Sequence, residues 1–243
     1  MAAIPTLEDE DAKRPSRERE TLVSECTRIV NRLRANLARL GIRGLKLTLA
    51  RALERLTALR TPEGTPLPAN TLAEMRRDVA RLRFVKEQIK EIERARAERL
   101  EQQSGDHRTA SVCLLRRVVG VGLETADMLV QEVFSRKLRD RKAVARYAGL
   151  TGAPNESGQK RRERGLSRAG NARVRRGMIH IAWGFLVHQK DSPLAMWYRA
   201  RTAGGRGGLR KTMIVALARK LLISFWRLVT TGEAPVGLAL RPA

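Results

Sequence analysis

Ser157 lies in a stretch whose residue types suit chemistry on a phosphate group. It precedes Gly158 in a segment rich in glycine and turn-forming residues, residues 149–158, which we predict to be a flexible loop rather than a helix or a central strand. An exposed hydroxyl flanked by guanidinium groups suits phosphate chemistry, because arginine binds phosphate with two hydrogen bonds and glycine lets the backbone approach closely. We predict phosphate contacts from Lys160, Arg161, Arg162, Arg164, Arg168, Asn171 and Arg173. A solvated loop that binds nucleic acid without chemistry is the alternative, since serine is common in loops.

A second candidate site is the sequence VVGVG, residues 118–122, which separates two short helical patterns. Turns of this kind occur in helix-hairpin-helix modules, where hairpin amides and the positive end of the second helix face a DNA phosphate. We therefore predict DNA contacts at Gly120 and Gly122. A tight turn between helices with no ligand is the alternative.

The charge of the chain points to a polyanionic partner. The formal net charge is +24 over 243 residues, which favours nucleic acid over an anionic membrane. Aromatic residues make up 4%, so base stacking on a sheet surface is not expected. The start of the chain is acidic where a signal peptide would be basic, and the most apolar stretch, residues 213–229, contains three cations. We expect a cytoplasmic protein.

The sequence predicts no metal site. Cys26 and Cys113 lie far apart in apolar helical contexts and are interpreted as buried free thiols. His180 and His188 have no carboxylate or cysteine at ligand spacing. The acidic cluster at residues 8–11 is interpreted as part of a solvated terminal tail.

The periodicity predicts a mainly α-helical fold with a long antiparallel coiled-coil hairpin, followed by a compact helical DNA-binding domain. Cys26, Val30, Leu33, Leu37 and Leu40 recur at spacings of four and three, and a similar seam follows Leu72. Leftover apolar surface could build a dimer, or the seam could serve an intrachain bundle alone. The expected divisions are a disordered tail (1–15), a coiled-coil linker domain (16–105), a C-terminal domain (106–231) and a loose tail (232–243).

An ordered set of segments resembles a known family. The run LLRRVVGVGLETADMLVQEV, the AGL of residues 148–150, Ser157 with Gly158, GLSRAGNARVRR and the late ALARKLL resemble the C-terminal domain of the insertion-sequence 110/116/902 transposases. NRLRANLARLGI, residues 31–42, resembles the coiled-coil linker of that family. The resemblance covers about residues 8–229.

The resemblance implies a DNA recombinase that mobilises an insertion sequence. In that family a serine in a Ser-Gly context attacks the DNA backbone, and Ser157 is the matching position. The family also has an N-terminal RuvC-like domain with four acidic residues that bind divalent metal, and an element-encoded RNA that directs target choice. No such acidic set stands upstream of the linker in this sequence. The expectation is therefore a truncated copy or one piece of a split element that binds no cofactor itself, with magnesium expected only together with the RuvC-like domain.

Three functions remain open on the sequence. The first is a transposase acting through Ser157, with DNA, a guide RNA and further copies of the chain as partners. The second is a non-catalytic DNA- or RNA-binding remnant of such a transposase. The third is a helical oligomerisation protein whose charge is incidental.

Overall fold

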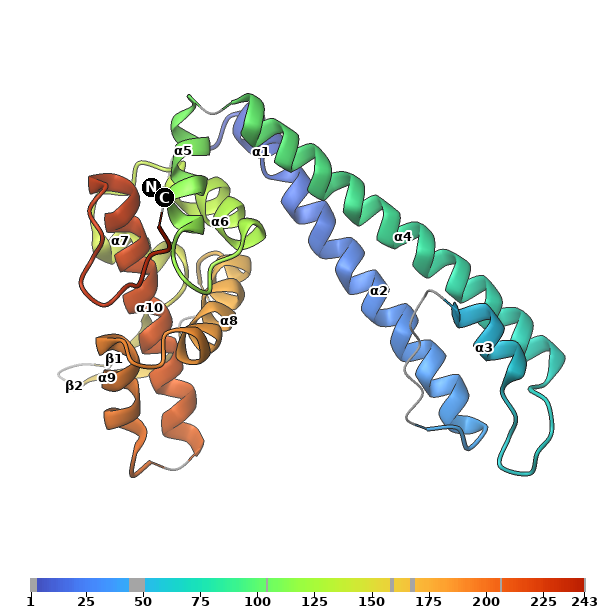
Figure 1. The fold of residues 1–243 in the computed structure, drawn as a ribbon. Helices are drawn as coiled ribbons and strands as arrows, with labels where there is room; N and C mark the ends of the chain where they lie inside the picture. The colour runs from blue at the N-terminus through green and yellow to red at the C-terminus, as the bar shows by residue number, and fades with distance from the viewer. Residues whose placement is uncertain are drawn as a thin grey trace. The chain divides into compact units, whose positions relative to one another are not determined.

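The computed structural model describes residues 4–43, 51–103, 105–157, 160–166, 169–205 and 207–242 (Figure 1), with residues 153–157, 160–165 and 207 described by their backbone alone. The fold is mainly α-helical, which confirms the predicted class. The chain forms two compact units, Arg14–Gln102 and Met1–Lys13 together with Gln103–Ala243. The predicted domain boundaries at 15, 105 and 231 stay predictions.

The first unit is built on two long helices, α2 (Arg14–Arg39) and α4 (Ala69–Gln102), with the short α3 (Ala52–Ala58) between them in the chain. α2 and α4 lie side by side (Figure 1). They are antiparallel, because Arg19 near the start of α2 pairs with Glu93 near the end of α4, and Asn36 pairs with Glu74 at the opposite ends.

An apolar seam holds this helix pair together. Ile29, Leu33 and Leu37 recur every four residues along α2 and are almost fully buried in one cluster with Val79 and Leu82 of α4. Each such side chain contributes about 1.5–3 kcal/mol when buried. The assignment of the pair as a coiled coil, and its use in a dimer, stay predictions.

The second unit packs its helices around α10 (Gly207–Thr231), which contacts α5, α7, α8 and α9. The side chains of Leu217, Leu221 and Phe225 on α10 are fully buried, so this apolar helix forms the centre of the unit. The other helices are α5 (His107–Arg116), α6 (Leu123–Leu129), the π-helical turn η2 (Val130–Phe134), α7 (Arg141–Tyr147), α8 (Ala172–His188) and α9 (Pro193–Thr202).

A two-stranded antiparallel hairpin replaces the loop that we expected around Ser157. Its strands are β1 (Gly152–Ser157) and β2 (Lys160–Leu166). The prediction of a loop is wrong because only Gly158 and Gln159 separate the strands in the sequence, and a glycine that begins a two-residue connection is typical of a β-hairpin. Gly158 itself lies outside the described residues.

Both expected tails contain ordered structure in the described part of the chain. Residues 7–11 form the short helix α1 (Leu7–Asp11), where Thr6 and Asp9 make a capping box, and Asp9 also pairs with Arg108 at 2.5 Å. At the other end, Val118 and Leu240 form an isolated antiparallel β-bridge. Backbone and side-chain hydrogen bonds fasten these segments, and polar composition alone did not reveal those partners.

No helix in the described ranges is both long and apolar enough to cross a membrane. Cys26 is half-buried, and its burial raises the pKa of the thiol. Cys113 is exposed, so the prediction of a buried thiol is wrong there. Its neighbour Val112 takes the buried face of α5, and successive residues of a helix point about 100° apart.

Candidate nucleic-acid site

The β1–β2 hairpin interrupts the chain between α7 and α8 and carries Ser157 at the last position of β1. The ladder pairs Ser157 with Lys160, and further from the turn it pairs Asn155 with Arg162. A strand rises about 3.3 Å per residue, so Ser157 stands about 17 Å from the base of the hairpin. The hairpin therefore presents the predicted serine at its tip.

The strand register sorts the charged positions between the two faces of the hairpin. Residues opposite each other share a face, and successive residues alternate between faces. The face of Ser157 therefore contains Asn155, Ala153, Lys160, Arg162 and Arg164, and the other face contains Glu156, Pro154, Arg161 and Glu163. Three cationic positions share the face of the serine, whereas both acidic positions lie on the other face. Of the predicted phosphate contacts, Lys160, Arg162 and Arg164 are grouped with Ser157, Arg161 is not, and Arg168 lies outside the described residues.

Two glycines close the base of the hairpin. Gly149 and Gly170 have φ values of +65° and +86°, which favour glycine. A Cβ atom on Gly170 would lie 2.7 Å from the carbonyl oxygens of Arg146 and Tyr147. The Asn171 amide donates to the Tyr147 carbonyl at 2.7 Å, so the two ends of the segment are held against each other.

Asn171 caps α8 and is bound on both sides of its amide group. Its Oδ1 accepts from the backbone amides of Arg173 and Val174, while its Nδ2 donates to Glu132 at 3.0 Å and to the Tyr147 hydroxyl at 3.4 Å. These contacts tie the start of α8 to α7 and to η2. The predicted DNA contact of Asn171 stays a prediction, and the structure gives its side chain a structural role.

Glu132 and Tyr147 belong to this arrangement although our reading of the sequence singled out neither. The Glu132 side chain is 3% exposed and accepts from Asn171 and from Arg173, whose Nη1 lies 3.5 Å away. The sequence does contain a signal, because a glutamate inside the apolar run LVQEVF needs a partner once it is buried. It also lies in a π-helical turn, a feature that often marks functional sites.

The VVGVG turn joins α5 to α6 and is bound by the C-terminal segment. Val119 N–H donates to the Ala239 carbonyl at 3.0 Å, and Gln189 bridges Val119 and Ala239 with hydrogen bonds of 2.7 and 2.8 Å. Gly120 has a φ of +90° and lies against His188, while Gly122 caps α6 beside open space. The Val119 amide therefore already donates its hydrogen bond within the chain, to the Ala239 carbonyl. DNA contacts at Gly120 and Gly122, and the assignment of a helix-hairpin-helix, stay predictions.

Hydrogen bonds hold two carboxylates near these elements in their charged form. The Ala143 amide, which donates to Asp140 at 2.7 Å at the start of α7, lowers the pKa of that carboxyl. The side chain of Arg108 lowers the pKa of Asp9. Within the described ranges, no three His, Cys, Asp or Glu side chains are grouped so that they could hold a metal ion. The expectation that divalent metal binds only together with a RuvC-like domain stays a prediction.

Comparison with known proteins gives two matches. Residues 112–198 match the sequence model described as "Transposase IS116/IS110/IS902 family". The chain is also 37% identical over 248 residues to "Putative transposase y4rJ" of Sinorhizobium fredii (strain NBRC 101917 / NGR234), an alignment that covers 99% of this chain and 63% of that relative. The matched region of residues 112–198 contains the VVGVG turn, the hairpin and its base. The chain is thus similar to transposases of the IS116/IS110/IS902 family, whose sequence model matches residues 112–198.

Proposed function

We propose that this chain acts in DNA transposition of an insertion sequence, and that Ser157 is the nucleophile that attacks the DNA backbone. The observation that carries the proposal is the register of the hairpin, which groups Ser157 with three cationic positions on one face. Phosphoryl transfer concentrates negative charge on the phosphate oxygens, and cations fixed beside it lower the energy of that state.

The proposed step is a transesterification. The oxygen of Ser157 forms a bond to phosphorus, and one ester bond between phosphorus and a sugar oxygen breaks. The serine proton leaves to a base or to solvent, and the released sugar oxygen takes up a proton to become a hydroxyl. The number of phosphate ester bonds is unchanged. The strand is cut, and the new ester between Ser157 and the phosphate can later be attacked by a sugar hydroxyl to rejoin a strand.

The close packing at the base of the hairpin, around Gly149, Gly170 and Asn171, supports this role; we call it the clamp. A tip about 17 Å from its attachment can direct a serine only if the base is fixed. Gly149 and Gly170 pack closely there, and Glu132 holds Asn171 and Arg173 at the start of α8. Arg173 thereby lies at the helix end nearest the hairpin in sequence, where anions are favoured.

The proposed partners follow from charge and family. DNA is the substrate, and an element-encoded RNA is a second polyanion that a net charge of +24 suits. Further copies of the chain are proposed to associate through the α2–α4 pair. The turn at Gly120 and Gly122 is proposed as a further phosphate contact.

A second function is a remnant that holds DNA or RNA without cutting it. The observation in its favour is the charge itself, which supports binding regardless of Ser157. Such a protein binds with steep salt dependence and forms no covalent link.

The distinguishing experiment is a denaturing gel of the chain incubated with DNA from the ends of the element. Incubations run with and without a separately supplied RuvC-like domain and magnesium. A protein–DNA adduct that disappears in Ser157→Ala supports the nucleophile. Binding that weakens with salt, with no adduct under either condition, supports the remnant and overturns catalysis.

A further inference from the structure

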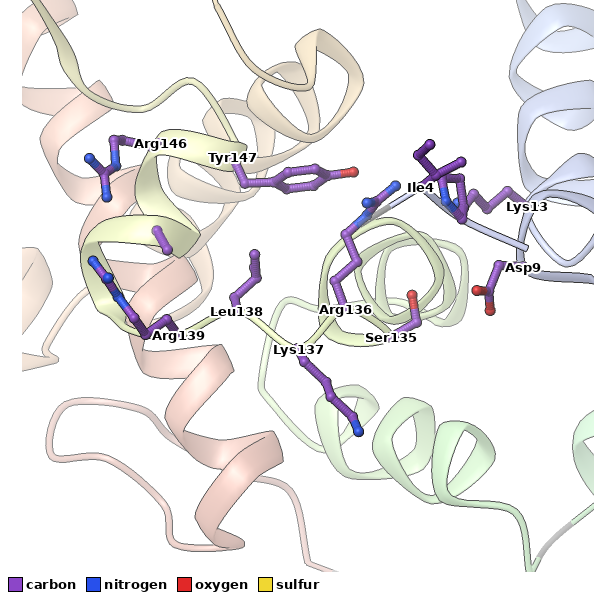
Figure 2. Close-up of a pocket in the computed structure, with 12 residues that line it drawn as sticks. Ile4, Asp9, Lys13, Ser135, Arg136, Lys137, Leu138, Arg139, Arg146 and Tyr147 are labelled. Carbon is purple, nitrogen blue, oxygen red and sulfur yellow. The ribbon is translucent and has the colours of Figure 1, made fainter. Parts of the chain in front are cut away.

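A cavity of about 720 Å³ lies in the second unit beside the base of the hairpin. Its lining comes from the N-terminal segment, from the residues that follow η2 and from α7 (Figure 2). The charged side chains that line it are Asp9, Lys13, Arg136, Lys137, Arg139 and Arg146. Five cations thus face one carboxylate.

That carboxylate does not neutralise the cavity. Asp9 is paired with Arg108, which is not among the lining residues. Lys13 and Arg139 have carboxylate partners of their own in Glu10 and Asp140. Lys137 and Arg146 are both exposed, and no ion pair joins either of them to a carboxylate in the described ranges. An anion is therefore the class of ligand that this cavity favours.

An aromatic ring in the same lining narrows the class of anion. The Arg136 guanidinium lies over the Tyr147 ring, 4.9 Å from its centroid. In the view of Figure 2, Arg139 and Arg146 lie to one side of that ring and Arg136 to the other. Nucleobases stack on aromatic rings and on guanidinium planes, whereas an inorganic anion or a lipid headgroup gains nothing from a ring. A phosphate beside a flat base is the chemistry of a nucleotide.

The cavity is continuous with the base of the hairpin. Arg146 and Tyr147 line the cavity, and their carbonyl oxygens also pack against Gly170. The Tyr147 hydroxyl accepts from Asn171, the cap of α8. A strand bound at the base of the hairpin would therefore lie next to residues that line the cavity.

We propose that this cavity holds one unpaired nucleotide of a bound DNA or RNA strand, with its base against the Arg136–Tyr147 pair and its phosphate beside Arg146 and Lys137. This inference rests on the proposed function and names a place where the strand is gripped. A volume of this size is typical of small-molecule sites and suits a single nucleotide. The basic run of residues 136–146 thereby gains a function that its composition alone does not assign.

The probes are short single strands of DNA and of RNA with one 2-aminopurine, and a DNA duplex with the same base paired. Stacking quenches the fluorescence of 2-aminopurine, so quenching on binding to the full chain reports entry of the base. Arg146→Gln is compared with Arg141→Gln, which removes an equal charge from the same basic run outside the lining. Tyr147→Leu removes the ring, and Tyr147→Phe keeps it.

We expect quenching with single strands and little with the duplex. Arg146→Gln and Tyr147→Leu should each weaken single-strand binding by about fivefold or more, while Arg141→Gln and Tyr147→Phe should change it less than about twofold. The arm that loses affinity, DNA or RNA, identifies the source of the nucleotide. Equal losses in Arg146→Gln and Arg141→Gln, or equal quenching of single strand and duplex, would overturn the proposal.

The test is independent of the serine chemistry. Ser157→Ala should abolish the covalent adduct and leave the quenching unchanged. Quenching without any adduct in the wild-type chain would overturn the proposed nucleophile and retain the cavity. An adduct without cavity-dependent quenching would overturn the cavity proposal and retain the proposed nucleophile.

Discussion

The α2–α4 helix pair and the β1–β2 hairpin with its base are held by different forces. The helix pair relies on repeated burial, with Leu33, Leu37 and Met75 fully or nearly fully buried along one seam. The hairpin base relies on single close approaches, at Gly149, Gly170 and the cap Asn171. One region spreads its stability over many apolar contacts, and the other concentrates its geometry in a few backbone atoms.

The difference predicts how each region tolerates change. Substitution at an exposed site of the helix pair should matter little, because such a side chain lies outside the buried seam. At the hairpin base a single methyl group meets backbone, which cannot move aside as a flexible side chain can. We therefore expect core substitutions to reduce stability, and hairpin substitutions to reduce chemistry.

The largest effect is expected from Leu33→Ala in the seam. Leu33 is fully buried, so its truncation leaves a cavity and should lower the free energy of unfolding by about 2–5 kcal/mol. The matched control is Val23→Ala on the same helix, where a 40% exposed side chain should cost less than about 0.5 kcal/mol. Urea titration followed by circular dichroism measures both. Similar losses at the two sites would show that the seam does not carry the stability.

Arg162→Gln and Arg161→Gln should separate the two faces of the hairpin. The variants remove equal charge from neighbouring positions, but only Arg162 shares the face of Ser157. We expect Arg162→Gln to slow adduct formation on the order of a hundredfold, and Arg161→Gln to slow it far less. The rate of adduct formation under saturating DNA is the readout. Equal rates in the two variants would contradict the sorted register.

Gly170→Ala should disturb the base of the hairpin. The substitution places a Cβ atom 2.7 Å from two carbonyl oxygens at a φ of +86°, which should cost about 1–3 kcal/mol and slow adduct formation. Gly208→Ala is the control, since open space surrounds that position at the start of α10. Thermal unfolding and hydrogen exchange of the Asn171 amide report the effect. Unchanged protection of that amide would show that the glycine is not needed for the clamp.

The smallest effect is expected from Asp140→Asn in acid. The Ala143 amide lowers the pKa of Asp140 in the folded chain, so the charged cap contributes stability above the ordinary value of 3.8. That contribution is lost as the pH falls through the lower folded pKa. Asparagine keeps the acceptor but does not titrate near that pH. The variant should therefore lose less thermal stability than the wild type between about pH 7 and about pH 3. An equal loss of thermal stability in the two proteins would show that Asp140 does not contribute to the destabilisation in acid.

The helical seam could be predicted from the sequence, whereas the hairpin and the contacts at its base could not. The spacing of Leu33 and Leu37 predicted a buried helical seam, because periodicity reports a face that many residues share. The hairpin was missed because its strands are short, and their sequences lack the alternation of apolar and polar residues that predicts a strand. Glu132 and Tyr147 meet Asn171 only through contacts between segments 24 and 39 residues apart in the chain. Pairing over such separations leaves no periodic trace.

The sequence indicated the basic composition around Ser157 but not its geometry. The basic run after Ser157 indicated phosphate binding, yet no count of arginines distinguishes Arg161 from Arg162. The strand register makes that distinction. Likewise the sequence contains a basic segment at residues 136–146, but only the fold brings Arg136, Arg146 and Tyr147 into one cavity.

Mass spectrometry of the adduct tests the central claim most directly. After nuclease digestion, trypsin separates the two serines of this region, because Ser157 falls in residues 147–160 and Ser167 in residues 165–168. We predict a nucleotide remnant on the first peptide, at Ser157. A remnant on Ser167, or an adduct that forms equally well in Ser157→Ala, would contradict the account.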